Sequence, residues 1–206
     1  MRVAIVGGTG DFGLALARRL ADAGEEVVLG SRDPERARIK AGEAGAAAGA
    51  ANEDAVAGVD LVVLATKAQA ALPTASALAG AIGETPLLSV ASALRFASHG
   101  VLPAAGARSL AEQIQDVVHG PVVAGLHSLA AGKLARTRPD EDALVCGDDP
   151  AAKALALELA AQVVAGRALD AGPLAGARAL EGLTAVIVNL NRRYRGHAGL
   201  RVTGLP

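Results

Sequence analysis

The feature that most constrains the fold is a glycine-rich loop near the N-terminus. Val3-Ala4-Ile5-Val6 is short, branched and fully apolar, as expected of a parallel strand covered on both faces. It leads into Gly7-Gly8-Thr9-Gly10-Asp11-Phe12-Gly13, in which Gly8, Gly10 and Gly13 satisfy the pattern G-x-G-x-x-G at the start of a helical pattern. We expect the first glycine to permit a tight turn, the second to let a diphosphate approach the backbone, and the third to let the helix pack on the strand. The sequence therefore predicts a dinucleotide site at a helix N-terminus.

Patterns typical of strands and helices alternate along the rest of the chain. Strands are expected over residues 26–30, 60–66, 86–90, 122–126, 143–146 and 167–169, and helices over residues 11–23, 69–82, 109–118, 150–164 and 173–194, with another opening at Asp33-Pro34. Residues 41–51 predict a helix end and a poor edge strand, and residues 91–107 a long irregular connection. This alternation predicts an α/β fold, a Rossmann-type doubly wound parallel sheet with a small C-terminal α/β extension.

The composition limits the class of partner. Twenty basic and 21 acidic residues give a net charge of −1, so no overall field attracts nucleic acid or an anionic membrane. The single cysteine, Cys146, excludes an internal disulfide and a cysteine-built zinc site, and we expect it to be a small buried thiol in a strand. No apolar run is long enough for a signal-peptide core or a membrane span. We therefore expect a soluble cytoplasmic protein that binds small molecules, with no metal site.

The end of the second predicted strand indicates which dinucleotide is bound. An acidic residue there would hydrogen-bond the ribose 2′-hydroxyl of NAD, but this chain has Gly30-Ser31-Arg32, with Arg36 one helical turn further on. A hydroxyl, a planar guanidinium and a second cation suit a 2′-phosphate. The sequence predicts NADP over NAD. It also predicts an NADP-binding Rossmann domain over residues 1–127 and a smaller C-terminal α/β extension over residues 128–206 that completes the cleft.

Other patterns point to ordinary structure. Gly7, Gly10 and Gly13 also fit the spacing of short-chain dehydrogenases, but those enzymes need a Tyr-x-x-x-Lys pair, and Ala198 lies four residues after Tyr194, the only tyrosine. Asp149-Pro150, which follows Asp148, predicts a helix cap and first helical residue rather than a carboxylate pair, and Asp170 predicts a turn.

Several segments together resemble one known family. They are the N-terminal strand with its glycine loop, Gly30-Ser31-Arg32, Leu126-His127-Ser128, residues 145–149, and residues 169–174 with Arg178 and Glu181 behind them. Over nearly the whole chain the sequence resembles the NADPH-dependent F420 reductases (F420H2:NADP oxidoreductases). The resemblance implies NADP and coenzyme F420 as cofactors, with a hydride transferred between them.

The resemblance also implies a set of binding residues. Beside Gly8, Gly10 and Gly13, the residues Thr9, Asp11 and Phe12 would line the diphosphate and ribose, and Ser31, Arg32 and Arg36 would hold the 2′-phosphate. Thr66 would be a further cofactor contact, Ala68 and Ala131 would lie near the nicotinamide half, and His127 would wall the site where the two rings meet. Because the cofactors carry the chemistry, we expect no catalytic residue, and at most a positioning role for His127.

Two alternatives stay open from the sequence. Lys67-Ala68 and Ala130 depart from the pattern of the family, and residues 67–107 match it least, so the chain could be an NADPH-dependent reductase of a flavin, an imine or a metal ion. It could also be a non-catalytic NADP-binding module. In either case the final helix could form a homodimer, through an apolar stripe of Leu180, Leu183, Val186, Ile187 and Leu190.

Overall fold

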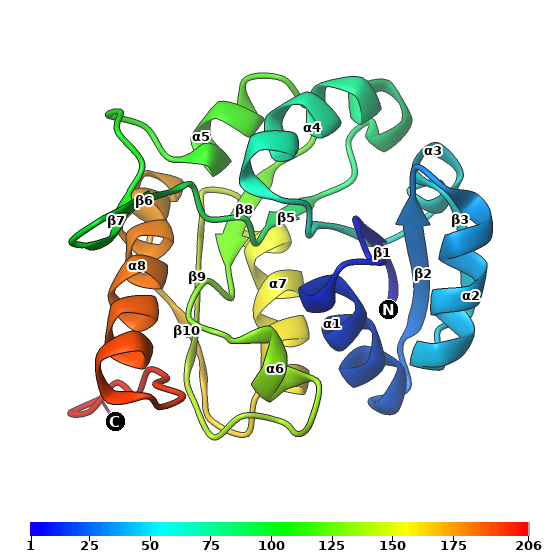
Figure 1. Cartoon of the computed structure of the whole chain (residues 1–206). Helices are drawn as coiled ribbons and strands as arrows, with labels where there is room; N and C mark the ends of the chain where they lie inside the picture. Colours follow the sequence, from blue (N-terminus) through cyan, green and yellow to red (C-terminus); the bar gives the residue numbers. More distant parts are fainter. Residues whose placement is uncertain (206) are drawn as a thin grey trace.

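An eight-stranded sheet forms the centre of the computed structural model, which describes residues 1–205 (Figure 1). The strand order is β10-β9-β8-β5-β4-β1-β2-β3. The strands are β1 (Arg2–Val6), β2 (Glu26–Ser31), β3 (Ala48–Ala51), β4 (Leu61–Leu64), β5 (Leu87–Ser89), β8 (Val122–Gly125), β9 (Ala143–Gly147) and β10 (Ala168–Asp170). The chain moves outward from β1 in one direction through β2 and β3, and then in the other through β4, β5 and β8. This reversal places the topological switch point of a doubly wound sheet between β1 and β4, where such folds bind ligands.

Helices cover both faces of the sheet (Figure 1). They are α1 (Asp11–Asp22), α2 (Pro34–Ala44), α3 (Asn52–Ala55), α4 (Ala68–Ile82), α5 (Leu110–Gln115), α6 (Ala131–Leu134), α7 (Pro150–Val163), the 3-10 turn η1 (Leu174–Gly176) and α8 (Ala177–Tyr194). One hydrophobic core joins the sheet to α1, α7 and the apolar side of α2, and the second joins it to α4, α5 and the start of α8.

The buried strands explain why the sheet needs helices on both sides. Val3 and Ile5 of β1 belong to the first core, whereas Ala4 and Val6 point into the second. β4 divides its residues in the same alternating way, because successive side chains of a strand leave opposite faces. The fully apolar runs seen in the sequence are therefore strands that have no solvent-facing side, as predicted.

The last two strands run against the other six. β8 pairs antiparallel with β9, and β10 pairs parallel with β9, so the sheet continues without a break across residue 127. The short helix α6 lies at the carboxyl end of β8, and the chain turns back there before β9 begins. The division into residues 1–127 and 128–206 stays a prediction, since both parts share this one sheet.

The connection expected over residues 91–107 is the main correction to the predicted elements. It contains an antiparallel hairpin of β6 (Leu94–Ala97) and β7 (Gly100–Pro103). The side chain of Asn189 in α8 holds this hairpin, because it accepts from the Val101 N–H at 2.9 Å and donates to the Val101 carbonyl at 2.7 Å. β6 has only four residues and none of them is buried, so the pairing depends also on a contact 88 residues away that the local pattern does not display.

Helix α8 differs slightly from the expected 173–194, because residues 174–176 form a 3-10 turn before it. Its predicted apolar residues divide between two sides: Leu180 and Ile187 are buried, whereas Val186 and Leu190 are exposed. Glu181, also buried, accepts from the Ala111 N–H at 3.1 Å, which ties α8 to the first turn of α5. Burial raises the pKa of the Glu181 carboxyl.

Local chemistry sets the helix starts. Asp33 and Asp149 each accept a hydrogen bond from a first-turn N–H and precede a proline, so both predicted caps are confirmed.

Cys146 lies fully buried in β9, as predicted, and burial raises the pKa of its thiol to about 11. Within residues 1–205, no helix combines the length and apolar character needed to cross a bilayer, and no three metal-ligating side chains converge.

Candidate dinucleotide site

The glycine loop between β1 and α1 owes its shape to close backbone packing. Gly7 has a φ of +78°, so it makes the tight turn, a role we expected of Gly8. Gly8 instead packs tightly: a Cβ there would come within 2.5 Å of a Leu29 methyl carbon. A Cβ on Gly13 would lie 2.7 Å from the Gly8 Cα, so Gly13 lets α1 pack on the loop, as predicted.

Gly10 differs from the other glycines of the loop, because a Cβ there would meet only the Gly7 carbonyl, at 3.5 Å. Protein packing therefore does not require a glycine at this position. Gly10 is also the N-cap of α1 and has no side chain to accept from the first-turn N–H groups. An exposed helix N-terminus with free donors and no side chain over it is suited to an anionic diphosphate.

The end of β2 brings a hydroxyl and two cations beside this loop. Ser31 Oγ accepts from the Asp33 N–H at 3.1 Å, which leaves the Ser31 hydroxyl hydrogen free to donate to a ligand. Arg36 reaches back to the Thr9 carbonyl, with 3.5 Å between Nη2 and O, and so spans the space between α2 and the glycine loop. Arg32 is exposed and, among the described residues, its guanidinium forms no hydrogen bond or ion pair with the protein. The carboxylate of Asp33 is already engaged as the cap of α2.

These groups surround a cavity of about 530 Å³ at the carboxyl ends of β1, β2 and β4. Its lining includes six of the expected residues: Thr9, Gly10, Ser31, Arg32, Arg36 and Thr66. The other lining residues are Gly7, Asp33, Asn52, Ala65, Lys67, Gln69, Ala70 and Thr74. A volume of this size and a location at the switch point are typical of a nucleotide-binding cleft.

Two buried polar atoms of the cavity lack a protein partner. They are Thr66 Oγ1, at the end of β4, and Asn52 Oδ1, at the start of α3. A buried polar atom without a hydrogen bond costs free energy, so both are suited to contact a polar ligand. Together with the open N-terminus of α1 and the cations of α2, they show that the residues present fit NADP.

Sequence reasoning missed Asn52, Gln69 and Thr74. Asn52 follows the weak edge strand β3, and a Cβ on Gly30 would lie 2.9 Å from its Oδ1, so Gly30 admits the Asn52 side chain beside the end of β2. In the sequence, the sign that Asn52 could bind a ligand was its position directly after the carboxyl end of a weak predicted strand. Lys67, which is exposed, also lines the cavity.

His127 lies outside this cavity, after β8. It is buried, and neither ring nitrogen forms a hydrogen bond with a protein group. Burial lowers the pKa of the His127 imidazole to about 4, and a weaker opposing effect comes from the nearby backbone of Ala91. The ring is therefore neutral near pH 7, with one donor and one acceptor available.

Further buried hydroxyls lie at the same edge of the sheet. Ser89, at the end of β5, and Ser128, beside His127, each have a buried Oγ without a hydrogen-bond partner. Thr184 of α8 donates to the His127 carbonyl at 2.8 Å, and its hydroxyl also contacts Ser92 Oγ at 2.7 Å. These bonds hold the β8 end, the start of the hairpin connection and α8 together. They define a second polar region beyond the cavity, toward α8.

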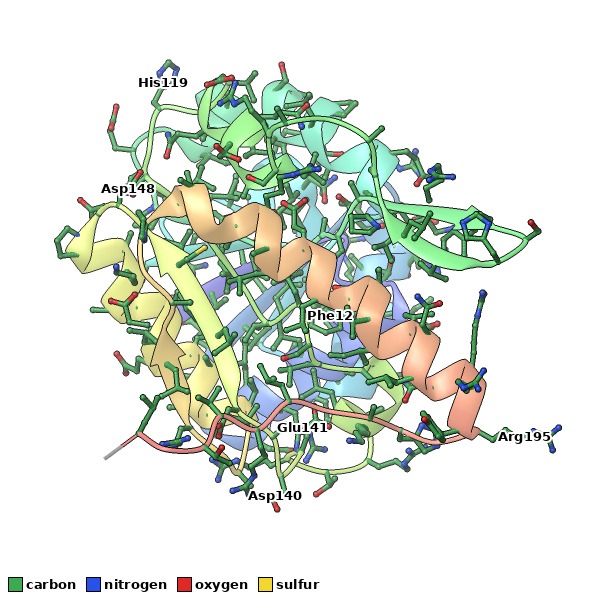
Figure 2. The ribbon with its side chains drawn as sticks, turned by 90° about the vertical axis from the view of Figure 1, so that its left-hand side faces the viewer. Phe12, His119, Asp140, Glu141, Asp148 and Arg195 are labelled. Carbon is green, nitrogen blue, oxygen red and sulfur yellow. The ribbon has the colours of Figure 1, made fainter. Side chains whose placement is uncertain are left out.

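The remaining expected residues lie between these two regions or inside the fold. Asp11 and Ala131 line a shallow groove between α1 and α6. Phe12, labelled in Figure 2, packs partly buried against the first core, and Ala68 against the second. The structure thus gathers Thr9, Gly10, the three expected 2′-phosphate residues and Thr66 in one cavity, whose lining does not include the other expected residues: Gly8, Asp11, Phe12, Gly13, Ala68, His127 and Ala131.

The carboxylates considered for other chemistry have structural roles. Asp148 accepts from the Leu174 N–H at 2.9 Å, and Asp149 caps α7. Asp170 accepts from the Gly172 N–H at 2.8 Å and forms an ion pair with Lys153 at 3.0 Å. The Gly172 N–H, followed by Lys153, lowers the pKa of the Asp170 carboxyl. The predicted cap and turn are confirmed.

The fold and the cavity define the protein as a member of the Rossmann-type, NADP-binding reductases. Residues 2–93 match the family described as NADP oxidoreductase, coenzyme F420-dependent. The F420-dependent NADP reductase of Methanothermobacter thermautotrophicus is 36% identical over the whole chain and 96% of its own length. The F420-dependent NADP reductase of Methanocaldococcus jannaschii is 33% identical, again over the whole chain. The chain belongs to the family of F420-dependent NADP reductases.

Solved structures agree with this assignment. A protein of Arthrobacter sp. FB24, described as a candidate F420-dependent NADP reductase, superimposes with a TM-score of 0.85 at 30% identity, and 99% of this chain is covered. The Streptomyces aurantiacus imine reductase superimposes with a TM-score of 0.63 at 22% identity. The second likeness extends to the fold alone.

Proposed function

We propose that this protein transfers a hydride between NADP(H) and the deazaflavin coenzyme F420. The observation that carries the proposal is the cavity in which the open N-terminus of α1 faces Ser31, Arg32 and Arg36. Membership of the F420-dependent NADP reductase family supplies the second cofactor. With that family assigned, neither reduction of another acceptor nor a non-catalytic role is favoured.

The chain's own residues bind and orient in this proposal. The N–H groups at the start of α1 and the backbone at Gly10 hold the diphosphate, while Arg32, Arg36 and the Ser31 hydroxyl hold the 2′-phosphate. Thr66 and Asn52 offer their unpartnered oxygens to the nucleotide.

His127, in the neutral form, stands with Ala68 and Ala131 on the side of the reacting rings, where hydride transfer needs the two carbons about 3–3.5 Å apart. The reaction chemistry is that of the two bound cofactors.

The experiment is an absorbance assay with purified protein, NADPH and oxidised F420. Loss of the deazaflavin absorbance with matched oxidation of NADPH is the expected result, and it should be much slower with NADH. Binding of NADPH without any turnover would instead identify a binding module. NADPH oxidation with a flavin or an imine, but not with F420, would identify a reductase of another acceptor.

We further propose that two chains associate through α8. Val186, Leu190 and Tyr194 are 53%, 42% and 72% exposed, and their spacing of four residues places them in one stripe along the helix. A two-fold pairing would cover the same stripe on both chains. Leu190→Glu should convert a dimer to a monomer in light scattering, whereas Ile39→Glu, on exposed α2, should not. A wild-type chain that is monomeric at micromolar concentration would contradict this pairing.

A cytoplasmic location stays a prediction from the sequence.

A further inference from the structure

The C-terminal end of α8 and the β6–β7 hairpin carry an unbalanced positive charge. Residues 182–206 contain Arg192, Arg193, Arg195 and Arg201 but no acidic residue, and the hairpin contains Arg95 and no acidic residue. This is unusual in a chain whose net charge is −1. Arg201 forms an ion pair with Asp140, and the nearby Glu141 is engaged by Lys133. Among the described residues, Arg95, Arg192 and Arg195 form no ion pair.

A stacking contact links the two cationic elements. The Arg192 guanidinium carbon lies 5.6 Å from the centre of the Phe96 ring, which is the range of a cation–π interaction. Phe96 is 66% exposed, and Arg192 is exposed as well, so the contact lies at the surface of the protein. Figure 2 shows Arg195 at the free end of α8, projecting on the same side of the molecule as the tip of the hairpin. The cations therefore lie on two elements that contact each other, the C-terminal end of α8 and the hairpin.

The positions of these arginines along the chain relate them to the proposed ring site. Thr184 contacts the His127 carbonyl, and Arg192 and the C-cap residue Arg195 follow Thr184 by eight and eleven residues. At 1.5 Å per residue, Arg192 and Arg195 lie about 12 and 16 Å along the helix from that contact. A ligand chain that extends from a ring near His127 to these two cations would therefore span about 12–16 Å.

We propose that Arg192 and Arg195, with Arg95 of the hairpin, form a subsite for the anionic tail of the deazaflavin. This inference rests on the proposed function. Coenzyme F420 continues from its ring through a ribityl chain to a phosphodiester and glutamate carboxylates, so it carries several negative charges at that distance. Guanidinium groups bind phosphate and carboxylate oxygens in paired hydrogen bonds. A cluster of unpaired cations also raises the local concentration of an anionic ligand.

The test compares two acceptors that share the same ring. One is F420, and the other is its riboflavin-level precursor, which has the deazaflavin ring and the ribityl chain but no phosphate or glutamate. The double variant Arg192→Gln, Arg195→Gln should raise the KM for F420 about fivefold to tenfold, because two exposed charged contacts are lost. The KM for the truncated acceptor and the KM for NADPH should stay within about twofold of the wild type, the range expected when no contact is lost. The wild-type preference for F420 should weaken as salt rises.

Two matched variants separate the charge from other effects. Arg2→Gln removes one exposed positive charge at the start of β1, a central strand of the sheet, and should leave both KM values unchanged. Phe96→Leu removes the stacking contact but no charge, so it should change the KM for F420 less than the double variant does. Circular dichroism melting of each variant checks that the fold is retained.

The outcomes are distinct. Equal losses for both acceptors, or no loss for either, would overturn the tail subsite while leaving the hydride transfer intact. If the wild-type protein reduces neither acceptor with NADPH, the proposed function fails. A larger loss for F420 than for the truncated acceptor supports the subsite.

Discussion

Replacing Arg32 tests the assignment of the cavity most directly. The exposed guanidinium is free of protein partners and borders the cavity beside Ser31 and Arg36. A charge-assisted hydrogen bond contributes about 1.5–3 kcal/mol to the binding free energy when it is shielded from water, and about 1 kcal/mol when it is exposed to solvent. Arg32→Gln should therefore raise the KM for NADPH about fivefold.

Arg32→Glu should have a larger effect, because it adds repulsion. A carboxylate about 4 Å from a doubly charged phosphate costs about 2 kcal/mol in water, so the total loss reaches about 3 kcal/mol, or roughly 100-fold in affinity. The KM for NADH should change little or fall, since NADH lacks the 2′-phosphate. The ratio of kcat/KM for NADPH and NADH is therefore the quantity to measure.

A neighbouring arginine provides the control. Arg38 lies on α2, is paired with Glu35 at 2.9 Å and does not line the cavity. Arg38→Gln removes the same charge from the same helix and should leave the cofactor ratio unchanged. If Arg32→Glu and Arg38→Gln change this ratio equally, or neither changes it, Arg32 does not contact the phosphate and the reasoning from the β2 end is wrong.

Three further predictions concern the loop, the buried histidine and the hairpin. Gly13→Ala, whose Cβ would strike the loop backbone at 2.7 Å, should lower the free energy of unfolding by about 1–3 kcal/mol in thermal denaturation, whereas Gly10→Ala should fold normally and bind NADPH more weakly in a fluorescence titration. Because the pKa of His127 falls to about 4 on folding, protons bind more readily to the unfolded chain between pH 6.5 and 4; stability should drop over this window by up to about 3 kcal/mol, and His127→Gln should flatten the drop in denaturant titrations at several pH values. Asn189→Ala removes both bonds to Val101, so hydrogen exchange of the hairpin amides should accelerate at least tenfold, as expected for the loss of about 1.4 kcal/mol or more, while α7 amides should keep their wild-type rates.

The first half of the site could be predicted because its geometry is local. A strand, a glycine turn and a helix start occupy consecutive residues, so the spacing of Gly8, Gly10 and Gly13 predicts which backbone groups would face a diphosphate. The end of β2 is likewise read along the chain, where Ser31 and Arg32 end the strand and Arg36 follows one helical turn later. The buried strands were predictable for a similar reason, since burial on both faces leaves only apolar residues in the run.

The rest of the site depends on residues distant in sequence that meet in the fold. Asn52 and Thr66 border the cavity only because β3 and β4 lie on either side of the β1–β2 pair, and this strand order is a property of the whole sheet. Asn189 stabilises the hairpin across 88 residues, and Thr184 joins α8 to His127 across 57. No local pattern encodes these pairings.

The sequence by itself determined the nucleotide half of this protein, because a short run of residues with fixed spacing specifies that half. Only the tertiary structure decided the other half: the reversal of β9, the hairpin held by α8, and the contact of Arg192 with Phe96. The physical reason is that packing between separate elements, rather than the conformation of any one of them, brings those groups together.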